Sequence, residues 1–299
     1  MKSVTVDDLK KLYLPPPTSH KGQNGRLCII GGSHLFHAAS LWALTVASRI
    51  VDLVHYSSVP ENNTLVEKIK SEFRDGIVVP RSDLDAYIEE DDVILIGPGM
   101  TRSSLRSSGQ ARIGSLRELE QIHDEGLLTA ALTNYLLAKY PQKQWVIDAG
   151  ALQMMDVSLI PKNAILTPHH GELEGLTSRM KNYDLRITNK TIEKQVEEFA
   201  REYQCIILLK GPIDIMCSSA ECREVVGGNS GMTKGGTGDV LAGLVAALAC
   251  KNDPFLAAIA GSFINKKAGD ALYSRVGPFF NASDLANQIP RTMKELLIP

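Results

Sequence analysis

Apolar residues along this 299-residue chain gather in short continuous runs that end at glycine or proline. Runs of this kind are typical of parallel β-strands, because both faces of such strands are buried. The pattern therefore predicts a mainly parallel sheet covered on both sides. The clearest runs lie at residues 26–32, 51–58, 75–80, 91–99, 144–150, 163–168 and 205–211.

Segments between these runs carry apolar residues at spacings of three and four, which is the pattern of amphipathic helices. The clearest are residues 39–50, 125–140 and 191–203. Strand and helix in alternation predict an α/β fold with right-handed crossovers and helices on both faces of the sheet. We expect one domain spanning residues 1–299, because α/β folds often reach this length as a single unit.

The pattern changes after Cys222. One short strand at 223–227 is followed by a glycine-rich stretch and then by predicted helices at about 238–250, 254–273 and 282–296. Residues 100–126 are rich in Ser, Arg and Gly. That composition predicts a loop or lid with one helical turn, and a plain solvated surface loop is the alternative.

The glycine-rich stretch is the strongest chemical signal in the chain. Six glycines fall within residues 227–238, directly ahead of an apolar helical pattern. Backbone N–H groups at Gly235, Gly236 and Gly238, with the positive end of the helix dipole, can converge on one anionic group. Asp239 follows in the first helical turn, where a carboxylate could act as base for a hydroxyl that attacks a phosphoryl group. The alternative is that Asp239 only stabilises the helix start.

Charge, cysteine content and the N-terminal residues narrow the class of protein. A net charge of −2 gives no reason to expect a nucleic-acid or membrane partner. We expect neither a signal peptide nor a membrane span, because the first residues contain acids and a proline run and no apolar stretch reaches about 20 residues. The five cysteines are odd in number and lie mostly in apolar runs, which favours reduced thiols, a cytoplasmic location and no cysteine metal site. P-loop and dinucleotide fingerprints are absent.

Six motifs in order along the chain resemble those of a known family. They are HKGQNGRLCIIGGS, VILIGPGM, VIDAGAL, LTPHHGELEGL, ILLKGP and NSGMTKGGTGDVLAG, and together they closely resemble the ATP- or ADP-dependent NAD(P)H-hydrate dehydratases. The resemblance covers roughly residues 18–290. It implies the ribokinase-like fold, a three-layer α/β/α sandwich with a mainly parallel central sheet.

The resemblance also implies a repair reaction. The S epimer of hydrated NADH or NADPH would be phosphorylated on its ring hydroxyl by ADP or ATP with Mg²⁺, and loss of phosphate would restore NAD(P)H. Asp239 would be the base, and the N–H groups of Gly236 and Gly238 would stabilise the transferring phosphoryl group. Glu172 would hold Mg²⁺ through water, or else cap the following helix.

Further binding residues follow from the same resemblance. The hydrated dinucleotide would contact Ala39, Gly99, His169, Asn229 and Asp239, with a plain turn residue as the alternative for Asn229. The nucleotide would contact Lys210, Gly211, Pro212, Ile213, Asp214, Gly235, Thr237 and Gly238. The sequence departs from the family at Gly150, where a second aspartate is usual, and at Asn265, where histidine is common.

The resemblance extends to partners. It implies a homo-oligomer and a functional link to an NAD(P)H-hydrate epimerase, which we expect on another chain because few residues lie outside the matched region. The identity of the donor, ADP or ATP, and the preference for NADH or NADPH hydrate stay open. The alternative functions are a small-molecule kinase of the same superfamily, such as a hydroxyethylthiazole-type kinase, and an inactive nucleotide sensor.

Overall fold

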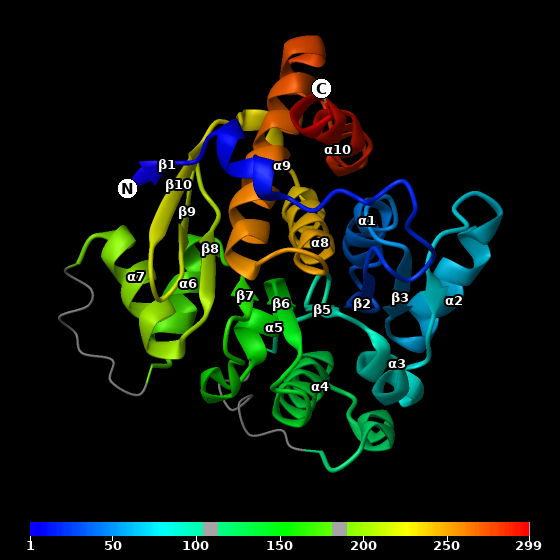
Figure 1. The fold of residues 1–299 in the computed structure, drawn as a ribbon. Coiled ribbons are helices and arrows are strands. Elements are labelled where there is room, and N and C mark those ends of the chain that lie inside the picture. Colours follow the sequence, from blue (N-terminus) through cyan, green and yellow to red (C-terminus); the bar gives the residue numbers. More distant parts are fainter. Residues whose placement is uncertain (104–112, 181–189, 299) are drawn as a thin grey trace.

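The computed structural model describes residues 1–103, 113–180 and 190–298. Within them, a ten-stranded sheet has the order β1-β10-β9-β8-β7-β6-β5-β2-β3-β4 (Figure 1). The strands are β1 (Lys2–Ser3), β2 (Arg26–Ile30), β3 (Leu53–Ser57), β4 (Ile77–Val78), β5 (Val93–Ile96), β6 (Gln144–Ile147), β7 (Ile165–Leu166), β8 (Ile206–Leu209), β9 (Ile213–Cys217) and β10 (Cys222–Val226).

Helices follow most strands and form the outer layers. They are α1 (Ala38–Ala47), α2 (Pro60–Lys68), α3 (Leu84–Glu90), α4 (Glu125–Lys139), α5 (Ala149–Met154), α6 (His170–Thr177), α7 (Ile192–Tyr203), α8 (Thr237–Ala249), α9 (Pro254–Val276) and α10 (Ala282–Leu297). Short 3₁₀ helices include η1 (Val6–Lys11), η5 (Leu116–Gln121) and η8 (Ser230–Thr233).

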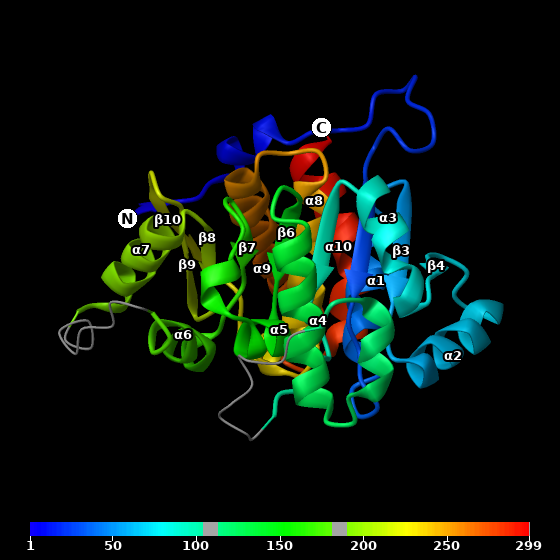
Figure 2. The same cartoon turned by 90° about the horizontal axis from the view of Figure 1, so that it is seen from below.

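Each face of the sheet has its own apolar core, as the continuous runs predict. Leu27 and Ile29 of β2 pack in a cluster with residues of α1, α8, α9 and α10. Their neighbours Cys28 and Ile30 lie in the opposite cluster with residues of α3 to α7. Figure 1 shows α9 and α10 above the sheet and α4 below it, and in Figure 2 α4 lies in front of the strands. This arrangement confirms the expected three-layer α/β/α sandwich.

The order of the strands reverses next to β2. The chain continues from β2 to β3 on one side, whereas β5, β6, β7 and β8 extend the sheet on the other side. Ligands of open α/β sheets bind at such a reversal, beyond the carboxyl ends of the strands. Two glycine-containing turns lie there, Gly31–Gly32 after β2 and Gly97–Gly99 after β5.

The pattern of apolar residues missed the interior strand β9 and the two-residue edge strand β1. β9 pairs antiparallel with both β8 and β10, although the other strand pairs are parallel. Its sequence, IDIMC, contains a charged residue, so it does not stand out as an apolar run. The predicted helical turn in residues 100–126 is confirmed by η5, whereas residues 104–112 of that segment lie outside the described residues.

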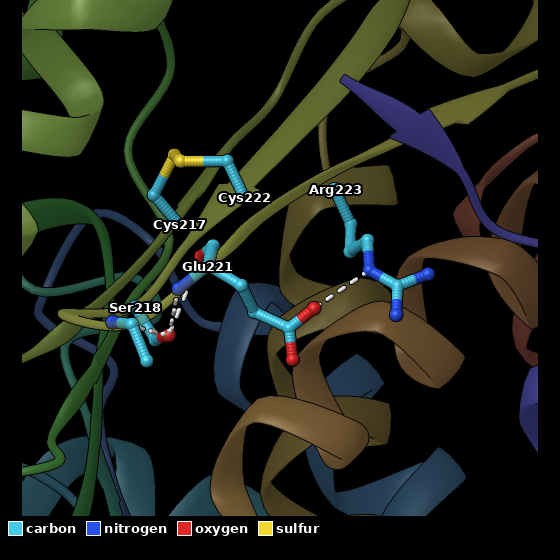
Figure 3. Close-up of a disulfide and its surroundings, with 6 residues drawn as sticks. Cys217, Ser218, Glu221, Cys222 and Arg223 are labelled. Atoms are coloured by element: carbon cyan, nitrogen blue, oxygen red, sulfur yellow. Dashed lines mark hydrogen bonds and ion pairs between the residues drawn. A yellow bond between two sulfur atoms is a disulfide. The ribbon is translucent and has the colours of Figure 1, made fainter.

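The expectation that all cysteines are reduced was wrong. Cys217 and Cys222 form a disulfide between directly paired positions of β9 and β10 (Figure 3). The hairpin turn brings their Cα atoms to 4.1 Å, a proximity that a count of cysteines cannot reveal. Cys28, Cys205 and Cys250 are free and buried. Across the described ranges, no helix combines the length and apolar character needed to span a bilayer.

Candidate active site

The glycine-rich stretch forms the N-terminal end of α8. The helix begins at Thr237, with Gly236 as its N-cap in a left-handed conformation at φ 94°. A Cβ atom at Gly236 would collide with the ring of Trp42, so this position requires glycine for both conformation and space. The first N–H groups of a helix lack partners within it, which leaves this end suited to an anion.

Asp239 lies in the first turn of α8. Its side chain is partly accessible, yet enough protein surrounds the carboxyl group that desolvation raises its pKa to about 7. The nearby carboxylates of Asp148 and Glu172 act in the same direction, and the ammonium of Lys210 opposes them. A carboxyl group with this pKa exchanges a proton readily near neutral pH.

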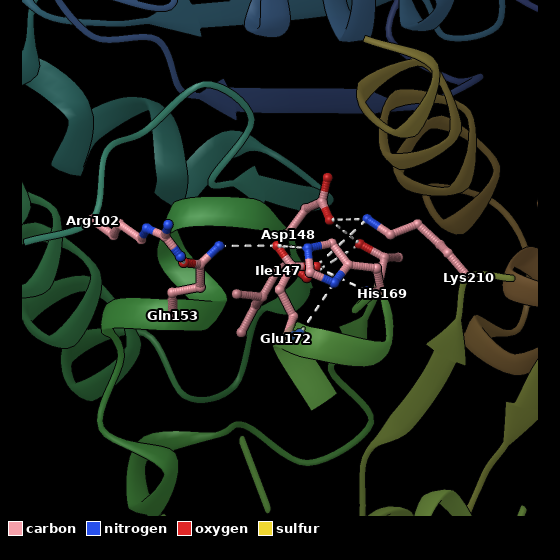
Figure 4. A network of polar contacts seen from close by, with 8 residues as sticks. Arg102, Ile147, Asp148, Gln153, His169, Glu172 and Lys210 are labelled. Carbon is pink, nitrogen blue, oxygen red and sulfur yellow. Dashed lines mark hydrogen bonds and ion pairs between the residues drawn. The ribbon is translucent and has the colours of Figure 1, made fainter. Parts of the chain in front are cut away.

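Lys210 connects the acidic residues of this region (Figure 4). Its Nζ atom lies 2.8 Å from Oδ1 of Asp148 and 3.9 Å from Oε2 of Glu172. Burial opposes the charge of Lys210, but these carboxylates raise its pKa above the usual value. Asp148 also accepts a hydrogen bond from the Thr167 hydroxyl at 2.8 Å. The ammonium therefore stays charged among several acids.

His169 and Glu172 form a reciprocal cap at the start of α6. The carboxylate of Glu172 accepts from the His169 N–H at 2.9 Å, and Nδ1 of His169 accepts from the Glu172 N–H at 3.2 Å. Nδ1 therefore carries no proton in this arrangement, and the N–H of the ring lies on Nε2, 3.6 Å from Oε1 of Glu172. Capping was the alternative that the sequence left open for Glu172. In the described parts of the chain, no three His, Cys, Asp or Glu side chains gather as a metal cluster.

A cavity of about 610 Å³ opens between the β8–β9 turn, the glycine-rich stretch and α9. We call it the donor cavity, because the resemblance assigns the donor nucleotide to its residues. It brings together most of the residues that the resemblance assigns to the nucleotide, but neither Ile213 nor Gly235 lines it. The predicted residues on its wall are Lys210, Gly211, Pro212, Asp214, Thr237 and Gly238, and it also includes His169 and Asn229.

Several polar side chains of this cavity form hydrogen bonds within the loops that surround it. Asn229 is extended, not left-handed, and its Oδ1 accepts from the Gly231 N–H at 3.0 Å as the cap of η8. The Thr237 hydroxyl lies 2.7 Å from the Met232 carbonyl oxygen. Asp214 accepts from the Gly211 N–H at 2.9 Å and from the Ser262 hydroxyl at 2.7 Å.

Lys266 on α9 is a component of the cavity that the sequence did not single out. Its Nζ atom donates to the carbonyls of Gly211, Pro212 and Gly227 at 2.9, 3.0 and 3.1 Å and lies 3.3 Å from Asp214. It thus ties the β8–β9 turn to the end of β10. The sequence carries no local signal for it, because its partners lie 39 to 55 residues away.

Ala39 and Gly99 meet at the reversal of strand order, outside the lining of the donor cavity. Gly99 has φ 73°, and a Cβ atom there would lie 2.9 Å from that of Ala39. The same turn approaches α5 closely, since a Cβ atom at Gly150 would collide with the Met100 carbonyl oxygen. An aspartate at position 150 would therefore not fit this backbone. We call this corner the acceptor side, because the resemblance assigns the hydrated dinucleotide to Ala39 and Gly99.

Comparison with known proteins places the chain in a family. A family model described as NAD(P)H-hydrate dehydratase matches residues 27–291. An ADP-dependent (S)-NAD(P)H-hydrate dehydratase from Cenarchaeum symbiosum is 31% identical over 308 residues, covering 98% of this chain and 97% of that protein. A bifunctional NAD(P)H-hydrate repair enzyme from Methanocaldococcus jannaschii is 34% identical over 297 residues, covering 96% of this chain and 52% of that protein. The chain thus spans about half the length of this relative.

A solved structure supports the fold. A ribokinase-like superfamily protein from Enterococcus faecalis superposes with a TM-score of 0.80 at 22% identity, covering 100% of this chain and 97% of that chain. This likeness confirms the predicted ribokinase-like fold, whereas the role of each site residue stays a prediction. The match of the family model over most of the sequence shows that the chain belongs to the NAD(P)H-hydrate dehydratase family.

Proposed function

We propose that this chain dehydrates the S epimer of hydrated NADH or NADPH in a nucleotide-dependent reaction. The observation that carries the proposal is the position of Asp239 in the first turn of α8, next to Gly238 on the donor cavity wall and with a pKa of about 7. Membership of the dehydratase family supplies the substrate class and favours this activity over a small-molecule kinase.

In this proposal Asp239 takes the proton of the ring hydroxyl as the hydroxyl oxygen attacks the terminal phosphoryl group of the donor. A new O–P bond forms, and the P–O bond to the departing nucleotide breaks. The C–O bond of the phosphorylated ring then breaks with its electron pair on phosphate, and loss of a proton from the neighbouring carbon restores the double bond. Phosphate leaves readily, whereas hydroxide does not.

The remaining groups stabilise charge. N–H groups at Gly236 to Gly238 and the ammonium of Lys210 would face the phosphoryl group, where charge spreads over the equatorial oxygens. The donor in our proposal is ADP, because the Cenarchaeum relative is named as ADP-dependent. ATP is the alternative donor.

The acids of this site fit Mg²⁺. The carboxylates of Asp148 and Glu172 both lie near Lys210, and Mg²⁺ commonly keeps several waters while binding one or two carboxylates and the substrate phosphates. Glu172 and Asp148 would therefore hold the ion through water. When bound, Mg²⁺ neutralises charge on the donor phosphates.

Partners and location form part of the proposal. We propose a homo-oligomer in the cytoplasm, a single dehydratase domain, and a functional link to an epimerase that supplies the S epimer. The word bifunctional in the name of the Methanocaldococcus relative supports such a link.

The test is the return of near-ultraviolet absorbance of the reduced nicotinamide ring. Purified protein with Mg²⁺ and hydrated NADH or NADPH is assayed with ADP, ATP or no nucleotide. We expect recovery only with a nucleotide, and faster recovery with ADP. Folded protein that binds nucleotide but restores no absorbance would overturn the proposal and redirect the search to alcohols as phosphoryl acceptors.

A further inference from the structure

A second cavity lies on the other side of His169 from the donor cavity. Its volume is about 380 Å³, within the usual range for small-molecule sites. His169 is the residue that lines both cavities. The lining consists of Arg102, Gln153, His169, Gly171, Glu172, Gly175 and Arg179.

Two glycines leave this cavity hollow. Gly171 and Gly175 are one turn apart on α6, and both line it. A Cβ atom at Gly175 would have nothing within 4 Å, and one at Gly171 would meet only the ring of His169, at 3.3 Å. Glycine within a helix costs about 1 kcal/mol of stability relative to alanine. Because the described residues around Gly175 leave room for a side chain, packing does not explain why glycine stands there.

Two of the five described polar side chains around the cavity are cationic, those of Arg102 and Arg179, and one, Glu172, is acidic. Arg102 is exposed, and its nearest described partner is the neutral Gln153, with Nη1 3.4 Å from Oε1. The guanidinium of Arg179 bonds only to carbonyl oxygens among the described residues, those of Leu152, Gln153, Met155 and Gly175. Both guanidinium groups thus lack a described carboxylate partner within salt-bridge distance.

Glu172, the one acid that lines this cavity in the described part of the chain, already accepts hydrogen bonds. Glu172 accepts from Nε2 of Gln153 at 3.1 Å and from the His169 N–H at 2.9 Å, and it faces the ammonium of Lys210. Figure 4 shows Arg102 and Lys210 at opposite ends of this chain of contacts, with His169 between them. The cavity therefore offers the guanidinium of Arg102 to a ligand, whereas both carboxylate oxygens of its acid already have partners among the described residues.

The position of Arg102 connects the cavity with the acceptor side. Arg102 follows three residues after Gly99, which packs against Ala39. An acceptor molecule that starts at this corner can extend past Arg102, while the nucleotide occupies the donor cavity beyond His169. The forked guanidinium of arginine matches phosphate oxygens in particular.

We propose that the second cavity binds a phosphate group of the acceptor dinucleotide, with Arg102 and Nε2 of His169 as its donors. This inference rests on the proposed function for the identity of the acceptor. Gln153 positions Arg102, and the bare face of Gly175 provides the space. The group is either the diphosphate, which NADH and NADPH hydrates share, or the 2′-phosphate, which only NADPH hydrate carries.

Binding without turnover tests the inference. ADP-ribose and 2′-phospho-ADP-ribose are titrated calorimetrically into protein whose donor cavity is saturated with a non-hydrolysable nucleotide. We expect Arg102→Ala and Gly175→Leu each to raise Kd at least about tenfold, the first by removing charge-assisted hydrogen bonds and the second by filling the hollow. Arg201→Ala, an exposed arginine on α7, is the matched control and should leave Kd unchanged.

The two ligands identify the phosphate group. Loss of affinity for both assigns the diphosphate, and loss for the 2′-phosphorylated ligand alone assigns the 2′-phosphate. Unchanged Kd values in both variants, or no binding of either ligand to the wild-type protein, would overturn the inference. The titration needs no catalysis, so the two proposals can fail separately. A wild-type protein that restores no NAD(P)H but binds these ligands through Arg102 would refute the dehydratase proposal and leave phosphate binding in the second cavity intact.

With an active enzyme, a second readout is available. Arg102→Ala should raise KM for the hydrated dinucleotide at least about tenfold while kcat changes little, because the phosphate lies away from the reacting ring and is bound equally in the ground and transition states. An equal loss in kcat with unchanged KM would contradict a binding role.

Discussion

At the scale of single residues, the ionisation of Asp239 sets how the proposed reaction depends on pH. Desolvation raises the pKa of its carboxyl group to about 7, and only the ionised carboxylate accepts a proton. Mg²⁺ held near Asp148 and Glu172 would oppose part of this rise, so we expect kcat/KM to increase about tenfold per pH unit below a pKa at or below about 7 and to level off above it. A pH profile checks this, and a flat profile would contradict it.

The matched control for this profile is Asp239→Asn, which keeps the size of the side chain and removes the base. Turnover should fall by about 10²- to 10⁴-fold, the usual scale for a lost general base, with nucleotide binding retained. Unchanged turnover would remove Asp239 from the mechanism.

Neighbouring glycines of the same loop should differ sharply in their tolerance of a methyl group. Gly236→Ala forces a side chain into a left-handed position against Trp42 and should cost about 1–3 kcal/mol in the free energy of unfolding. At Gly235 a Cβ atom would meet nothing within 4 Å, so Gly235→Ala should stay within about 0.5 kcal/mol. Denaturant unfolding measures both, and equal losses would argue against the close packing of Gly236.

At the scale of elements, the sequence predicted what local patterning specifies. β2 and β5 are apolar on both faces, and the glycines before α8 mark its start within one residue. β9 was not predicted because Asp214 interrupts its apolar pattern. The charge of Asp214 is buried only with the help of Ser262 and Lys266, which lie 48 and 52 positions further along the chain. Interactions at that separation leave no periodic signal.

The same limit applies to the candidate site. Motifs at the ends of successive strands identified Lys210 and His169, because parallel strands bring their carboxyl ends to one edge. Arg102 and Gln153 stand in no recognisable motif, and only the fold places them next to His169. Predicting Arg102 and Gln153 would have required knowing which residues lie close together in space.

The Cys217–Cys222 disulfide stabilises the β9–β10 hairpin at the end that lies away from the donor cavity. The disulfide closes the turn end of the hairpin, whereas Lys266 holds the opposite end, at Gly211 and Gly227. Reduction should lower the free energy of unfolding by about 2 kcal/mol, the loop-entropy value for so short a loop, and leave nucleotide affinity nearly unchanged. Thermal unfolding and nucleotide titration, each with and without reductant, check this.

A thiol titration in denaturant provides the control for that experiment. The oxidised protein should show three thiols, those of Cys28, Cys205 and Cys250, and reduction should add the pair from the hairpin. Five thiols without reductant would contradict the disulfide. A large loss of nucleotide affinity on reduction would contradict the separation between the two ends of the hairpin.

At the scale of the whole molecule, the two sides of the site come from distant parts of the chain. The acceptor side is built on β2 and β5, and the donor cavity on β8, β9, α8 and α9. They meet where Lys210 at the end of β8 reaches Asp148 at the end of β6. The middle of the sheet therefore sets the distance between the donor cavity and the acceptor side, and helices of the carboxyl-terminal part complete the wall of the donor cavity.

This division makes Lys266 a test of how the last helices contribute to function. Lys266→Met removes the ammonium that joins the β8–β9 turn to the end of β10 and leaves Asp214 buried without it. Breaking a buried pair of this kind costs about 3–5 kcal/mol, and the loosened turn should weaken nucleotide binding at least about tenfold. Lys267→Met is the matched control, because Lys267 is exposed and its ammonium contacts only the face of Phe263 among the described residues. Nucleotide titration and thermal unfolding of both variants compare them, and equal behaviour would show that α9 only covers the sheet.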